Sequence, residues 1–183
     1  MINLPSLRRL DIDGFGLYPG TEGASGLHVE FRPGLTLALG ANGLGKTTLV
    51  TVVYRMLTGP REIPNLSEDG ALGTPRLEVR ELSRVERSTF ANRVVDGARE
   101  ATAALVFHLG GAVLTVVRRL DTLALTSWSI EGTDAGADED EYEAAVLERA
   151  GMSSFSDWIL LSVFGSIIGG TKGQGRLATP SPL

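Results

Sequence analysis

The chain has 183 residues, of which 43% are hydrophobic and 21% are charged, so it can bury the core of about one domain and is not disordered throughout. It contains no cysteine and only two histidines, which excludes disulfide scaffolds, thiolate metal sites and histidine-built zinc centres. Its formal net charge of −5 argues against a protein that binds nucleic acid through a large net positive charge.

The polar and apolar residues also argue against a membrane or secreted protein. Met1–Asp11 mixes charged residues into a short apolar run, unlike a signal peptide. The longest apolar stretch, Trp158–Ile168, is about half the length that a helix needs to span a bilayer. We therefore expect a soluble, cytoplasmic domain that does not bind membranes.

The first third of the chain is predicted to contain short strands followed by one helix. Alternating or apolar patterns predict strands over Leu7–Asp13, Gly26–Phe31 and Leu35–Leu39. Lys46–Leu57 is predicted to be a helix that stops at Thr58-Gly59-Pro60. Because β-branched residues crowd this segment, only packing against a sheet would hold it helical.

The middle of the chain is predicted to hold a loop, a helix and an antiparallel meander. Pro60–Pro75 contains turn formers without a period and is predicted to be a loop, whereas Arg76–Val95 is predicted to be a helix with one apolar side. Gly110-Gly111 between two apolar runs is a strong hairpin signal. The strands of the meander are predicted over Ala103–Leu109, Ala112–Leu120 and Thr122–Ile130.

The last part of the chain is predicted to form two helices, followed by a segment of different composition. Glu131–Glu143 carries seven carboxylates, and we expect its first half to be a solvated loop. Helices are predicted over Glu139–Ala150, ended by Gly151, and over Ser153–Ile168. The glycine- and proline-rich remainder has little to bury, so we expect one domain over residues 1–168 and a disordered tail over residues 169–183.

The most informative segment is residues 40–47, GANGLGKT, which match the phosphate-loop pattern G-x-x-x-x-G-K-[ST] at every fixed position. A predicted strand precedes this loop and a predicted helix follows it, as the pattern requires. Glycine allows the backbone to turn its N–H groups toward phosphates, and the helix directs its positive end at the same place. A chance glycine-rich turn is the weaker interpretation, because the whole chain has only two lysines, Lys46 and Lys172.

Each side chain in the loop has a chemical role if it binds a nucleotide. Lys46 would reach the β- and γ-phosphates, Thr47 would place its hydroxyl on Mg²⁺, and Thr48 would lie beside the α- or β-phosphate. The candidate nucleotide-binding residues are Asn42, Gly43, Leu44, Gly45, Lys46, Thr47 and Thr48, with Thr47 as the one metal ligand.

This loop and the patterns around it resemble the N-terminal half of the SbcC-type, SMC-like ATPases, which are ABC-class enzymes of double-strand-break repair and chromosome maintenance. The likeness covers about residues 5–165, and the segments that carry it are Leu7–Phe15, Val29-Glu30-Phe31, Pro33-Gly34-Leu35, GANGLGKTT, LVFHLGGAVLTVVRRL and FSDWILLS. It implies an α/β fold, namely a P-loop NTPase lobe with a mixed sheet and an antiparallel β subdomain, with ATP and Mg²⁺ as cofactors. It also implies as partners a second ATPase lobe or head, a nuclease subunit and DNA.

Other motifs of that family are missing from the sequence. No apolar strand ends in the Asp-Glu pair that holds the metal and activates water, and there is no L-S-G-G-Q signature or heptad segment. Val163-Phe164 stand where the Q-loop glutamine is expected, and Gly16 follows Phe15 where arginine is often found. We therefore assign no catalytic residue and expect hydrolysis to require a missing second lobe, with the chain truncated or frame-shifted near the Q-loop.

Two other interpretations stay open beside an ATPase lobe. The missing acidic pair favours a non-catalytic nucleotide-binding or assembly module, and a non-functional truncated fragment has the same sequence signature. A transporter-type ABC subunit is weaker because it needs the same missing motifs.

A candidate contact with the DNA backbone is offered by one face of the predicted helix, which carries Arg80, Arg84 and Arg87. Acidic residues are interleaved with these arginines, and such a mixture of charges is more typical of a face that is only solvated.

Overall fold

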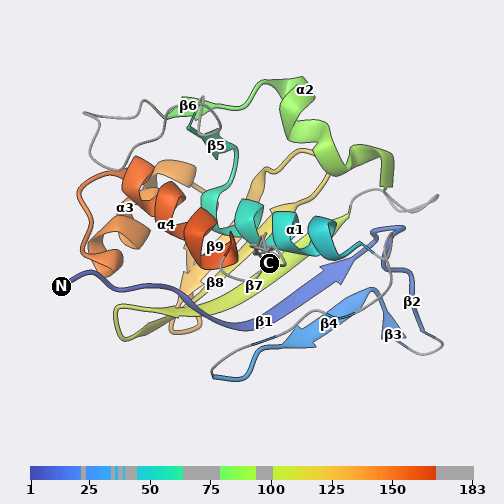
Figure 1. Cartoon of the computed structure of the whole chain (residues 1–183), viewed down its shortest axis with the longest axis horizontal. Coiled ribbons are helices and arrows are strands. Elements are labelled where there is room, and N and C mark those ends of the chain that lie inside the picture. The colour runs from blue at the N-terminus through green and yellow to red at the C-terminus, as the bar shows by residue number, and fades with distance from the viewer. Residues whose placement is uncertain are drawn as a thin grey trace, which may run out of the picture.

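The computed structural model describes residues 1–21, 24–33, 36, 39, 45–63, 79–93 and 101–167. Its strands are β1 (Ser6–Asp13), β2 (Gly20–Thr21), β3 (Ala24–Ser25), β4 (Leu27–Glu30), β5 (Arg61–Glu62), β6 (Arg80–Glu81), β7 (Thr102–Leu109), β8 (Ala112–Arg119), β9 (Leu125–Ile130) and β10 (Thr133–Gly136). Its helices are α1 (Lys46–Thr58), α2 (Arg84–Arg87), α3 (Glu139–Ala150) and α4 (Phe155–Ile167), with a 3-10 helix, η1, over Ser88–Arg93. Figure 1 shows their arrangement.

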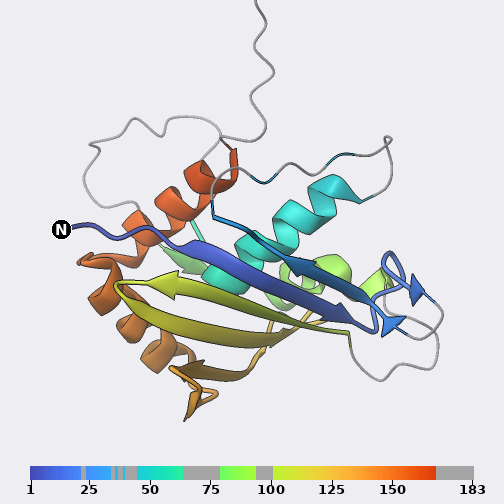
Figure 2. The same cartoon turned by 90° about the horizontal axis from the view of Figure 1, so that it is seen from below.

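A six-stranded sheet in the order β10-β9-β8-β7-β1-β4 forms the centre of the molecule, and every described pairing in it is antiparallel. Along β7 and β8, buried residues alternate with partly exposed ones, as expected for a sheet with one face against a core. Helices α1 and α3 contact β7, α1 also contacts β8, and α4 packs against α1 and α3. Figure 2 shows these helices on one side of the sheet.

Most predicted elements are confirmed. The strands β1, β4, β7, β8 and β9 and the helices α1, α3 and α4 lie where the sequence patterns predict them, with end points that differ by a few residues at most. The strand expected over Leu35–Leu39 falls on residues that are largely outside the described ones. The tail over residues 169–183 also lies outside them. None of the described helices is long and apolar enough to cross a membrane.

The helix predicted over Arg76–Val95 is wrong in its described part. Arg80 lies in β6, where its backbone pairs with Glu62 of β5, and only the short helix α2 and the 3-10 helix η1 follow. The reason is a capping box: Ser83 N donates to Glu86 Oε2 at 2.8 Å, and Glu86 N donates to Ser83 Oγ at 3.4 Å. This S-x-x-E signature starts a new helix at Arg84 and could have been recognised in the sequence.

Two predicted loops also contain short strands. Within Pro60–Pro75, Arg61–Glu62 forms β5. In the acidic segment, Glu131 and Gly132 have φ values of 51° and 77° and turn the chain so that β10 pairs with β9. Two consecutive residues with positive φ are typical of a tight hairpin turn, which glycine favours.

The C-terminal end of α1 is buried, and side chains from three other elements bind its last carbonyl groups. Arg118 Nε of β8 donates to the Met56 carbonyl at 3.3 Å. Tyr142 Oη of α3 and Trp158 Nε1 of α4 both donate to the Leu57 carbonyl, at 3.2 Å and 3.1 Å. These bonds replace the intrahelical partners that the last carbonyls of a helix lack, so α1 can end inside the core.

Arg118 carries a positive charge into this core. Its side chain is fully buried, and its guanidinium makes two bonds to the Glu139 carboxylate, at 2.6 Å and 2.5 Å. The charge also lies at the negative end of the α1 dipole, where a cation is favourable. The arrangement needs glycine at position 59, because a Cβ there would lie 2.6 Å from Glu139 Oε1 and 2.8 Å from Arg118 Nη2.

The two donors to the Leu57 carbonyl should be coupled energetically. We expect Tyr142→Phe and Trp158→Phe each to lower the free energy of unfolding by roughly 1 kcal/mol or somewhat more, because the other donor remains. The double variant should lose about 1 kcal/mol beyond the sum, since only it leaves a buried carbonyl without a donor. Urea unfolding of the four proteins measures this coupling, and strictly additive losses would contradict the role given to these two side chains.

Candidate functional site

The beginning of α1 contains no buried residue, whereas its C-terminal end lies in the core. Helix α1 starts at Lys46 after Gly45, whose backbone has φ 80° and ψ 10°. The N-cap residue, Gly45, has no side chain that could cap this end, and the first turn contains no acidic residue. The buried residues of the helix all lie from Val52 onward. The N–H groups of the first turn therefore offer an anion-binding site at the positive end of the helix dipole.

The structure brings the described part of the predicted phosphate loop to this helix start. Gly45, Lys46 and Thr48 are partly buried, and Thr47 is exposed. The remaining predicted residues, Asn42, Gly43 and Leu44, lie outside the described residues.

A turn that follows β1 contacts the same place, and sequence analysis did not identify it. Tyr18 Oη donates to the Gly45 carbonyl at 2.8 Å, and Tyr18 N donates to the Phe15 carbonyl at 2.9 Å. A Cβ added to Gly45 would lie 2.6 Å from Leu17 Cδ2 and 3.0 Å from Tyr18 Oη. Nothing in the local sequence pattern distinguishes Tyr18 from an ordinary turn residue.

These residues fit a phosphate ligand accompanied by a divalent cation. The positive φ of Gly45 and a first turn without acidic residues suit close approach of an anion, and Lys46 adds a positive charge. Among the described residues, no group of three His, Asp or Glu side chains could hold a metal ion. In a nucleotide complex, phosphate oxygens and water would also be ligands of a magnesium ion at Thr47, as is usual for Mg²⁺.

The arginine face proposed for DNA does not form, because the described residues contain no helix that joins Arg80 to Arg84 and Arg87. Arg80 Nη2 donates to Glu62 at 2.7 Å and to Glu86 at 2.7 Å, and Arg87 forms an ion pair with Glu81. Hydrogen bonds from Arg80 and from Ser83 hold the pKa of Glu86 well below its usual range. The acidic partners thus neutralise two of the three arginines.

A second basic site lies at the other end of β1, beside the last described strand of the sheet, β4. Its pocket of about 460 Å³ is lined by Arg8, Arg9, Glu30, Phe31, Arg32, Pro33 and Val106. A β-bulge between Leu7 and Arg9 leaves Arg8 unopposed on the neighbouring strand.

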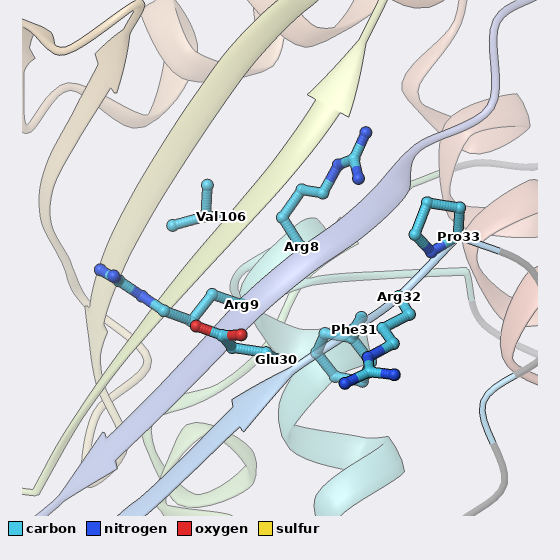
Figure 3. A pocket seen from close by; sticks show the side chains of 7 residues that line it. All are labelled: Arg8, Arg9, Glu30, Phe31, Arg32, Pro33 and Val106. Atoms are coloured by element: carbon cyan, nitrogen blue, oxygen red, sulfur yellow. The ribbon is translucent and has the colours of Figure 1, made fainter.

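The charges of this pocket do not converge. Figure 3 shows the guanidinium groups of Arg8, Arg9 and Arg32 pointing in different directions. Arg9 is also paired with Asp11 at 2.8 Å, and Glu30 adds a negative charge. The pocket is therefore a weaker phosphate site than the beginning of α1.

Comparison with known proteins identifies the family of the domain. Residues 9–126, more than half of the chain, match the family model of the AAA domain. The matched segment begins in β1, includes the phosphate-loop sequence and α1, and ends in β9. The match confirms the prediction of a P-loop ATPase-like domain, which is a nucleotide-binding class of domain. No curated protein matches the chain.

Replacing Gly45 tests how tightly the turn after β1 closes on the helix start. Gly132 has a similar φ of 77° but no atom within 4 Å of an added Cβ, so Gly132→Ala should cost about 1–2 kcal/mol of backbone strain alone. Gly45→Ala adds the contact with Leu17 and should cost at least about 1 kcal/mol more. Equal losses in urea unfolding would mean that the packing around Gly45 is looser than described.

Proposed function

Because the chain belongs to the AAA domain family, we propose that it binds ATP with Mg²⁺ at the beginning of α1. The observation that carries this proposal is the transition from Gly45 to Lys46, where a glycine with positive φ is followed directly by the start of α1. The sequence before it supplies the glycine-rich loop that a phosphate chain requires.

The described residues have distinct roles in this proposal. The N–H groups of the first turn of α1 donate to phosphate oxygens, and Lys46 neutralises charge on the β- and γ-phosphates. The exposed hydroxyl of Thr47 is a ligand of Mg²⁺, and Thr48 lies beside the α- or β-phosphate. Bound Mg²⁺ neutralises phosphate charge and holds the phosphate chain in one geometry. Asn42, Gly43 and Leu44 stand at variable positions of the motif and complete the loop in this proposal.

We further propose that the chain is the N-terminal lobe of an SbcC-type, SMC-like ATPase that acts in double-strand-break repair or chromosome maintenance. The features that support this are the phosphate-loop sequence, the antiparallel β7–β8–β9 meander and the following helices α3 and α4. In this proposal a second lobe supplies the missing acidic pair, and a second head, a nuclease subunit and DNA are its partners.

A non-catalytic nucleotide-binding or assembly module is the second candidate function. Among the described strands, none ends in an Asp-Glu pair, and β8 ends instead in Arg118 and Arg119. The described strands therefore lack the acidic pair that holds the metal and activates water in this class of ATPase. In such a module ATP acts as a ligand that stabilises an assembly, without turnover by this chain.

Calorimetric titration of Mg-ATP into the wild-type chain and Lys46→Ala tests nucleotide binding. Because a charge-assisted hydrogen bond contributes roughly 1.5–3 kcal/mol, affinity should fall about ten- to a hundredfold in the variant. Arg84→Ala is a matched control that removes an exposed cation from α2 and should bind normally. Unchanged affinity in Lys46→Ala would contradict the site, while binding without phosphate release would favour a module or a lobe that needs its second half.

A further inference from the structure

We propose that Tyr18 is a positioning residue for the nucleotide site, because its hydroxyl fixes the peptide group that joins Gly45 to Lys46. The inference rests on the proposed function, since it concerns how the phosphate-binding amides are oriented. It assigns a role to the turn after β1, which is distant in sequence from the loop and matches no phosphate-binding pattern.

The Gly45 carbonyl receives two hydrogen bonds. Tyr18 Oη donates to it at 2.8 Å, and Leu49 N donates to it at 2.8 Å in the first hydrogen bond of α1. A carbonyl oxygen has two lone pairs and can accept both bonds. The Gly45 carbonyl oxygen is therefore bound by one donor within α1, Leu49 N, and by one donor from the turn after β1, Tyr18 Oη.

The orientation of this carbonyl determines the direction of the next N–H group. The peptide unit is planar and trans, so the Lys46 N–H points opposite to the Gly45 carbonyl. Because the carbonyl points along the helix toward Leu49, the Lys46 N–H points out of the helix start, where a phosphate would bind. A hydroxyl that fixes the carbonyl therefore also fixes the donor on the ligand side.

Tyr18 can do this because its ring is anchored. Its ring centroid lies 5.7 Å from that of Phe15, which is fully buried. Phe15 in turn makes an edge-to-face contact with Phe90 of η1 at 6.0 Å. Leu17, from the same turn, borders Gly45 closely enough to exclude a Cβ there. The hydroxyl is thus placed by the core rather than by the ligand, so the site is organised before binding.

Tyr18→Phe tests the inference because it keeps the ring and removes the hydroxyl. We expect the dissociation constant for Mg-ATP to rise about two- to tenfold, as for loss of one neutral hydrogen bond. The matched control is Thr58→Val, which removes the bond from Thr58 Oγ1 to the Tyr54 carbonyl, 3.0 Å, at the other end of α1. Both variants should melt at a lower temperature, but only Tyr18→Phe should weaken binding and shift the Lys46 amide resonance in ¹H–¹⁵N spectra.

The outcomes separate this inference from the proposed function. If the wild-type chain does not bind Mg-ATP, the proposed function fails, and the Lys46 amide shift still decides whether Tyr18 orients that peptide group. If the wild type binds and Tyr18→Phe binds equally well, the positioning role is overturned. Equal weakening by Tyr18→Phe and Thr58→Val would also overturn it, because it would reflect general loss of helix stability.

Discussion

The structure depends on how α1 ends inside the core. The last carbonyl groups of a helix have no partners within it, and burying them without donors would cost about 1–3 kcal/mol each. Arg118, Tyr142 and Trp158 supply those donors from β8, α3 and α4, so the end of α1 is where the sheet and the two C-terminal helices meet. The ion pair between Arg118 and Glu139 compensates the only fully buried charge among the described residues.

The anchored C-terminal end of α1 also fixes the position of the first turn of the helix. The helix is rigid over its 13 residues, so a fixed C-terminus holds the first turn in position relative to the sheet. The turn after β1 fixes that first turn a second time, through the contacts of Leu17 and Tyr18 with Gly45. The two ends therefore have complementary chemistry: side chains of the protein donate to the carbonyl end, while the N–H end is the positive end of the helix dipole, which favours an anion.

Local patterns in the sequence predicted much of this fold but not its long-range contacts. Gly110-Gly111 and Gly151 located a hairpin and a helix end because each marks a backbone conformation with positive φ. The missed helix start at Arg84 was also local, since Ser83 and Glu86 form a recognisable capping box. Arg118 stands near the end of its strand, but its alternation with Leu114 and Val116 places it on the buried face. By contrast, the bond from Tyr18 to Gly45 joins residues 27 positions apart, and no periodicity encodes it.

Hydrogen exchange along α1, with and without Mg-ATP, tests the central claim most directly. The account predicts that the amides of Lys46, Thr47 and Thr48 exchange rapidly in the free protein and slow markedly when Mg-ATP binds. The amides of the last turn, including Gly59, which donates to the Arg55 carbonyl at 2.8 Å, should exchange slowly in both states. Unchanged exchange at Lys46–Thr48, or a last turn that exchanges as rapidly as the first, would contradict a helix anchored at one end and open to phosphate at the other.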